Sequence, residues 1–166
     1  MIEAEFETYI PRLLEYKRMG FSPERAVRAV LKDDALTDTS VSDDTAAYKA
    51  RECAVDPGDR AIVERVVQYA ADALGIDPPR VRFYRSEGMK FRGATDAASL
   101  DQIWVGADQS WYDQAEIALH EVAHVGHLTD DPTDLNHETA ERVAQRFVER
   151  GRSAGWIHSA ARAVGA

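Results

Sequence analysis

The chain has 166 residues, of which 45% are hydrophobic and 30% are charged. This length and balance predict a globular protein with its own core, and they exclude a long disordered tail. The net charge is −9, with 29 acidic against 20 basic residues, so tight nonspecific binding of nucleic acid at moderate salt is not expected. Cys53 is the single cysteine, which excludes an intramolecular disulfide and a cysteine-based zinc site.

The basic residues are almost all arginine, because Lys17, Lys32, Lys49 and Lys90 are the only lysines. Scarce lysine with abundant Asp and Ala is typical of proteins from salt-loving archaea or their viruses, and also of high-GC mesophiles. The amino-terminal residues lack the basic segment and apolar core of a signal peptide, and no run approaches the roughly 18 apolar residues of a membrane span. We therefore expect a protein of the cytoplasm, or of a particle assembled there, with no membrane partner.

The first 55 residues are expected to form a helical region that serves as a docking element or lid. Apolar residues at helical spacing predict a helix over 2–19, and Ser22-Pro23-Glu24 predicts the start of a short one ending near Leu31. Residues 33–42 are polar and predict an exposed linker. These helices are a candidate surface for a protein partner.

Residues 56–166 are expected to form the second and larger domain. Asp56-Pro57 begins a helix that Gly75 ends. Short strands are predicted over 81–84, 89–92 and 101–105, with a loop over 93–99. A turn at 107–110 then leads into a helix that continues to Leu128. A further helix is expected from Leu135 to Arg150, ended by Gly151, followed by a short amphipathic segment around Trp156.

The most specific chemical pattern is His120-Glu121-Val122-Ala123-His124. Residues four apart on a helix share one face and lie about 6 Å apart along its axis, so His120 and His124 can close on one Zn²⁺. Glu121 can then reach a water bound to that ion. The alternative interpretation is a pair of hydrogen-bonded core histidines, with Glu121 at the surface.

A catalytic zinc usually has three protein ligands, and several residues compete for the third position. His127 is seven residues from His120, about 10 Å along the helix, so one ion does not easily join both. In the helix that begins at Leu135, His137 lies at the edge of the apolar stripe, whereas Glu138 points away from it. We therefore expect His137 as the third ligand, ahead of Glu138. Two residues remain as less favoured ligands: Asp130, and Glu141, which could instead accept a hydrogen bond from a ligand imidazole.

From about Val81 to Gly151 the chain resembles the zincin metalloproteases. The resemblance rests on a strand at 101–105, a helix with His-Glu-Val-Ala-His, and a second helix entered by a third ligand. It is greatest for the SprT-like proteases, which place a third His about a dozen residues after the motif, as at His137. The run from His137 to Ala144 is also similar to the ImmA/IrrE-type peptidases, which have a Glu at the position of His137.

This resemblance implies an α+β, zincin-like fold, with a small, mostly antiparallel sheet packed on the active-site helix. It implies hydrolysis of a protein or peptide substrate, with zinc on His120, His124 and His137 and with Glu121 as general base. Tyr112 and His127 are candidate donors to the substrate carbonyl. An extended substrate is expected to add beside the strand that contains Ile103, Trp104 and Val105. The alternatives are a noncatalytic interaction or viral-particle module with this fold, and a peptidase-type regulator of a repressor.

Overall fold

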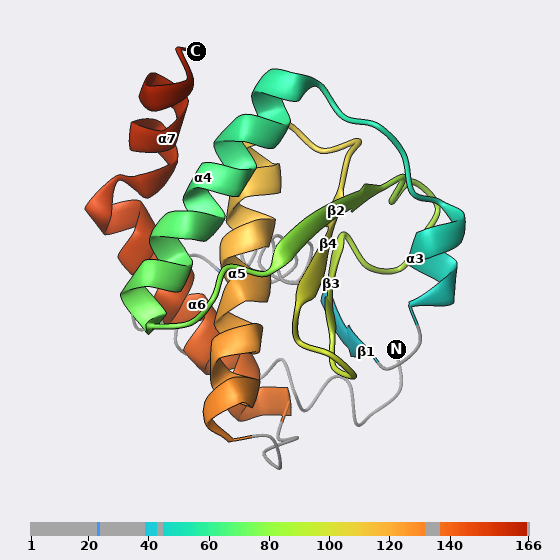
Figure 1. Cartoon of the computed structure of the whole chain (residues 1–166). Coiled ribbons are helices and arrows are strands. Elements are labelled where there is room, and N and C mark those ends of the chain that lie inside the picture. Colours follow the sequence, from blue (N-terminus) through green and yellow to red (C-terminus); the bar gives the residue numbers. More distant parts are fainter. Residues whose placement is uncertain (1–22, 24–38, 43–44, 132–136, 166) are drawn as a thin grey trace. The chain divides into compact units, whose positions relative to one another are not determined.

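The structure is a computed structural model that describes residues 23, 39–42, 45–131 and 137–165, with backbone alone for 39–42 and His137. One compact unit covers Thr37–Ala166, so the described residues between 39 and 55 belong to the same unit as the segment that was expected to begin a second domain at residue 56. The two helices expected before residue 32 lie outside the described residues, apart from Pro23. The described part of the chain has an α+β fold in which four helices lie on one side of a small sheet and a short fifth helix lies on the other (Figure 1).

The sheet has the strand order β1-β3-β4-β2, formed by Thr39–Ser42, Gly93–Asp96, Gln102–Gly106 and Arg80–Tyr84 respectively. β3 and β4 are antiparallel, whereas β2 with β4 and β1 with β3 are parallel. The sheet is therefore mixed, and the expectation of a mostly antiparallel sheet is wrong. The reason is that β2 and β1 join the outer sides of the β3–β4 pair, each parallel to its neighbour.

Alternation of side chains gives this sheet two different faces. Val81, Phe83, Ile103 and Val105 are buried in the main core, on the side of the helices. The opposite face carries a small aromatic cluster in which Trp104 and Tyr84 pack with Tyr48 of α3 (Ala46–Ala50). The Arg82 guanidinium lies 4.6 Å from the Trp104 ring centroid and is held by Glu52. Residues before 56 thus contribute to the same folded unit as the histidine motif.

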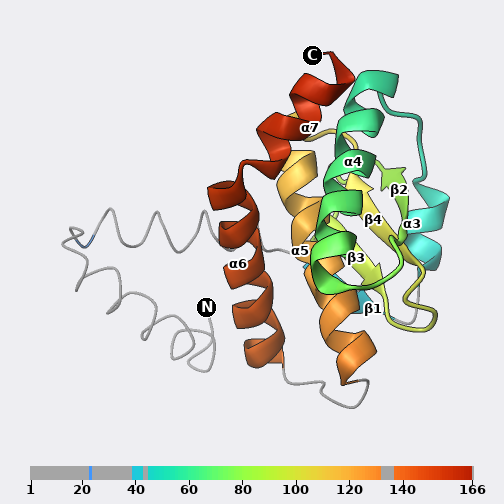
Figure 2. The same ribbon diagram turned by 60° about the vertical axis from the view of Figure 1, so that its left-hand side comes forward.

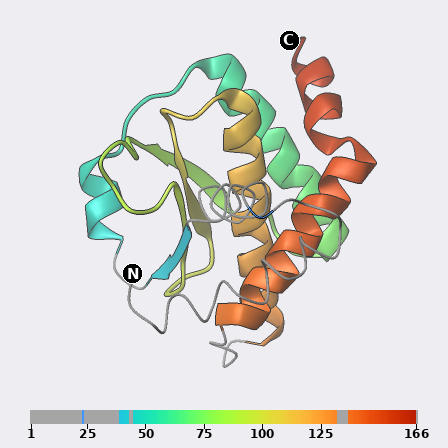
Figure 3. The same cartoon turned by 180° about the vertical axis from the view of Figure 1, so that it is seen from behind.

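Four helices build the other side of the unit. α4 (Pro57–Leu74) begins where the Asp56 side chain accepts hydrogen bonds from the backbone N–H groups of Gly58 and Asp59, and it ends at the left-handed Gly75. α5 (Trp111–Asp130) has its N-cap at Ser110. α6 (His137–Ala154) and α7 (Trp156–Val164) follow. Figures 2 and 3 show α5 between α6 and the sheet, which explains why fourteen of its residues are buried.

Several local expectations change in the structure. Thr39–Ser42 is strand β1, although 33–42 was expected to be an exposed linker, and 89–92 does not form the expected strand. Gly93–Asp96 is a fully buried strand and not a loop. Gly151 lies inside α6 and does not end it. A Cβ at Gly151 would lie 2.9 Å from Cδ1 of Leu119 and 3.0 Å from the Trp156 ring, so the glycine allows close packing of α6 on its neighbours. None of the described helices combines the length and apolarity that crossing a membrane requires.

Candidate metal centre

The side of α5 that faces α6 carries three polar residues at successive turns, Glu116, His120 and His124. All three are nearly inaccessible to solvent, with exposed fractions of 6%, 2% and 1%. Each meets a polar partner on α6. Glu116 contacts Arg152, and the two histidines contact Glu141. Buried polar groups are costly when unpaired, so these partners fix how the two helices pack.

The two imidazoles and the Glu141 carboxylate converge on one point. The Nε2 atoms of His120 and His124 are 3.1 Å apart. Nε2 of His120 lies 3.3 Å from one carboxylate oxygen of Glu141, and Nε2 of His124 lies 3.2 Å from the other. Among the described residues, these three form a group of metal-ligating side chains with one ligand atom from each within 4.8 Å of the others.

These separations suit one shared cation. Ligand atoms at about 2.0–2.1 Å from a tetrahedral zinc lie roughly 3.3–3.4 Å from one another, close to the separations seen here. Hydrogen bonding alone satisfies the group poorly. If each Nε2 donates its single proton to the carboxylate, the two N–H groups stand against each other at 3.1 Å. A cation accepts lone pairs from all three groups, so the residues present fit a zinc ion.

Glu141 is ionised at neutral pH in this setting. Burial alone would raise its pKa, but hydrogen bonds from His120 and His124, together with their charges, lower the pKa to about 2. The Glu141 side chain is also 23% exposed, the most accessible of the three groups. A negatively charged oxygen ligand therefore stands at the more open side of the site.

The remaining candidate ligands lie elsewhere or beyond what is described. Glu138 points away, with its side chain 85% exposed and paired with Arg142. Asp130 is exposed at the end of α5, and His127 is half-buried one turn before it; neither belongs to the metal-ligating group. His137, the expected third ligand, is the first residue of α6, and its side chain lies outside the described atoms.

Glu121 is on another side of α5 and faces the sheet. Its exposed fraction is 0%, so the alternative that placed it at the surface is wrong. Thr95 of β3 donates a hydrogen bond from its hydroxyl to Oε2 of Glu121. Gly93, two residues earlier, lies against the same carboxylate. Neither Gly93 nor Thr95 was a sequence candidate, since 93–99 was expected to be a loop without chemistry.

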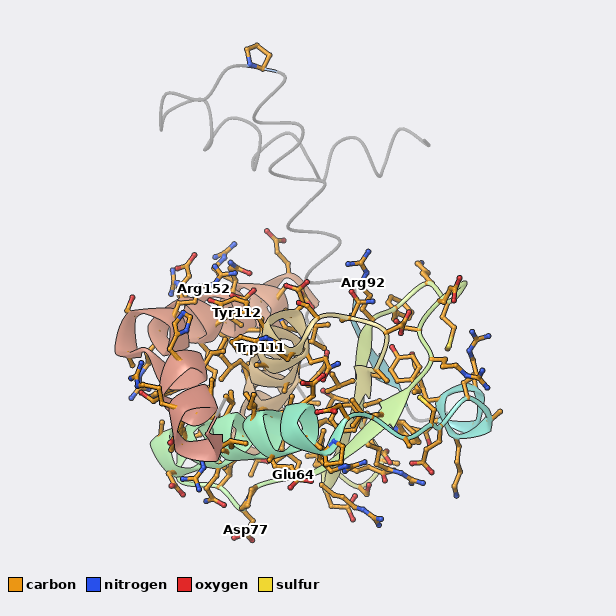
Figure 4. The ribbon with its side chains drawn as sticks, turned by 90° about the horizontal axis from the view of Figure 1, so that it is seen from above. Glu64, Asp77, Arg92, Trp111, Tyr112 and Arg152 are labelled. Carbon is orange, nitrogen blue, oxygen red and sulfur yellow. The ribbon has the colours of Figure 1, made fainter. Side chains whose placement is uncertain are left out.

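The residues expected to bind substrate are part of the core. Ile103, Trp104 and Val105 are completely buried in β4. β2 pairs with one edge of β4 and β3 pairs with the other. In this arrangement β4 offers no free edge to an extended peptide, because both rows of its backbone hydrogen-bonding groups are already used. Tyr112, a candidate hydrogen-bond donor to the substrate, lies near Glu116 and Arg152 (Figure 4). Glu116 is at the opposite end of the polar row on α5 from His124.

Comparison of the chain with protein-family models, with curated proteins and with solved structures found no match.

Proposed function

We propose that this chain is a zinc-dependent peptidase in which His120, His124 and Glu141 hold the ion and Glu121 is the general base. The observation that supports the proposal is the convergence of two imidazole nitrogens and one carboxylate within 3.1–3.3 Å. Two His and one Glu form a ligand set that leaves a fourth zinc position open for water or substrate. Glu141 replaces His137 in this proposal because its carboxylate contacts both histidines.

A zinc ion at this site would polarise a peptide carbonyl and make a bound water more acidic. Glu121 follows His120 directly, so its carboxylate is turned about 100° around α5 from the ligand side. From that position it would accept a proton on a carboxylate oxygen and return it to the leaving amine. Thr95 keeps the other oxygen occupied as a hydrogen-bond acceptor, which limits how the carboxylate turns.

A second candidate is a noncatalytic zinc-holding module. It is favoured by the burial of the motif, in which His120, Glu121 and His124 are at most 2% exposed. A peptide reaches Glu121 only if part of the chain moves. In the noncatalytic case the ion would connect α5 to α6 and contribute folding free energy, as structural zinc sites do.

The deciding experiment compares the full chain with Glu121→Gln. We expect both proteins to carry about one zinc per chain, since Glu121 is not a ligand. Only the wild type should cleave a broad peptide library and an unfolded protein substrate, and a chelator should stop cleavage until zinc is restored. Glu138→Gln, the same change at an exposed residue, is the matched control and should keep full activity.

Each contrary result has its own meaning. Zinc in both proteins without cleavage in either supports the noncatalytic module. A wild type that neither contains zinc nor takes it up from solution rules out both functions.

A further inference from the structure

Strand β3 presents two residues to the Glu121 carboxylate from the same face of the sheet. Gly93 and Thr95 are two positions apart, so both lie on the side that faces α5. Thr95 is completely buried. Its hydroxyl donates to Oε2 of Glu121, and Oε1 of Glu121 lies on the side of Gly93. The Glu121 side chain therefore contacts β3, although Glu121 itself belongs to α5.

The Thr95 hydroxyl has one proton and two acceptors within reach. One is the backbone carbonyl oxygen of Glu121 at 3.3 Å, and the other is Oε2 of the Glu121 side chain, which is closer. Oε2 is the closer acceptor, so the hydroxyl proton is directed to the carboxylate. Threonine is β-branched and stiff about χ1, and this holds the hydroxyl in place.

Gly93 provides the space that the carboxylate occupies. A Cβ at this position would stand 3.2 Å from Oε1 of Glu121, 3.3 Å from the Trp104 carbonyl oxygen and 2.5 Å from Cγ2 of Ile117. Ile117 and Glu121 are one helical turn apart on α5, so both contact β3 through the same face. Any side chain at Gly93 pushes this face of α5 away from the strand.

We propose that Thr95 is a positioning residue that holds the Glu121 carboxylate where it acts as general base. The inference rests on the proposed function, because it assigns Thr95 a part in the same reaction. Both acceptors near the Thr95 hydroxyl belong to Glu121, so Thr95 acts through that residue. Its loss should lower kcat while leaving KM and zinc content unchanged, since it affects neither substrate binding nor the ligands.

The test uses the full zinc-loaded chain with four substitutions, two at Thr95 and two controls elsewhere. Thr95→Val keeps the shape but removes the hydroxyl, and should lower kcat about 10–100-fold, as a misplaced catalytic group does. Thr95→Ser keeps a donor and should stay within about threefold of the wild type, because its hydroxyl can still reach the carboxylate. Thr129→Val removes a hydroxyl that bonds Val125 on the same helix, and should change nothing. Ile157→Ala, buried on α7, shows what lost stability alone does to kcat.

A second readout does not need turnover. In protein labelled with ¹³C at the glutamate carboxyl carbon, the Glu121 signal is identified by its loss in Glu121→Gln. We expect Thr95→Val to shift that signal, and Thr95→Ser and Thr129→Val to leave it in place. If Thr95→Val does not fold, Thr95→Ala removes the same hydroxyl without steric conflict.

The two proposals fail in different ways. Thr95→Val with wild-type kcat and an unmoved signal, beside an inactive Glu121→Gln, overturns the positioning role and leaves the peptidase standing. A zinc-loaded wild type that cleaves nothing overturns the peptidase and the catalytic role of Thr95 with it. The carboxyl signal then still decides whether Thr95 holds Glu121.

Discussion

Arg152 of α6 donates two parallel hydrogen bonds to the carboxylate of Glu116 on α5, from Nε at 2.5 Å and from Nη2 at 2.9 Å. Glu116 is 6% exposed, so this buried acid is neutralised by a residue of the neighbouring helix. The hydrogen bond to Glu116 in turn raises the pKa of Arg152. Glu141 is eleven residues before Arg152, about three turns, so one side of α6 holds α5 at both points.

Arg152→Met should therefore destabilise the protein, because it leaves the Glu116 carboxylate buried without its partner. Arg152 is partly exposed and solvent screens the pair, so we expect a loss of about 1–2 kcal/mol in the free energy of unfolding. Urea titration followed by circular dichroism measures it. Arg146→Met, at an exposed arginine of the same helix, should change stability by less than about 0.5 kcal/mol. Equal effects of the two substitutions would show that the pair does not matter.

Glu141→Ala should weaken zinc binding by more than about 100-fold, beyond the range seen when a group behind a ligand is lost. The reason is that it removes one of the three groups that converge on the ion. Competition against a chromophoric zinc chelator gives the affinity. Glu138→Ala, one turn earlier and exposed, is the control and should bind as the wild type does.

His137→Ala completes this series. Its effect should be smaller than that of Glu141→Ala if Glu141 is the third ligand. The reverse order would return the third position to His137 and make Glu141 a hydrogen-bond acceptor for the ligand imidazoles.

Gly93→Ala should destabilise the protein by about 1–3 kcal/mol, the usual range for overpacking a core. The added Cβ meets Ile117 and the Trp104 backbone, neither of which moves easily. Gly126→Ala on α5 is a useful comparison, because its Cβ meets only the flexible end of Leu74 at 2.9 Å, and alanine favours a helix. Thermal melting of the two variants should rank Gly93→Ala as clearly the worse. Equal melting temperatures would contradict the close packing of α5 on β3.

Asp96 should make the free energy of unfolding depend on pH in the acidic range. Burial alone would raise its pKa, but hydrogen bonds from the Gln102 side chain, the Ala98 backbone and Ser99 lower it below the ordinary value. A carboxylate with a lowered folded-state pKa stabilises the fold above its unfolded pKa of about 3.9. That contribution is lost as pH falls through the folded-state pKa. Asp96→Asn should therefore lose less stability than the wild type between pH 5 and pH 2. Urea titrations at each pH measure the free energy of unfolding. The same pH dependence in both proteins would contradict this role of Asp96.

The elements with strong local signals were predictable. Asp56-Pro57 and Gly75 mark the ends of α4, and both act as expected. β3 was missed because Gly93-Ala-Thr-Asp96 contains turn-forming residues and no apolar alternation. Its extended state comes from pairing with strands on both sides, which no short window of sequence contains.

Some residues of the candidate site were likewise predictable from local sequence, and others were not. The spacing of His120, Glu121 and His124 is local, and the structure keeps the two histidines on one side of α5. Glu141 was ranked behind His137 because it flanks the apolar stripe of α6, and helix phase does not say which flank meets the histidines. Thr95 and Arg152 are 26 and 36 residues from their partners, so only folding brings them together.

The pairing of β1 with β3 has a consequence for any peptide that approaches Glu121. Thr39 pairs with Gly93 and Val41 with Thr95, the two residues of β3 that contact Glu121. The other edge of β3 pairs with β4. An extended peptide can therefore pair with β3 only after residues 39–42 have left its first edge. A tethered segment competes at an effective concentration that is often in the millimolar range for a short connection. Residues 39–42 thus compete with a free peptide for that edge of β3, and the peptide has to bind more strongly to displace them.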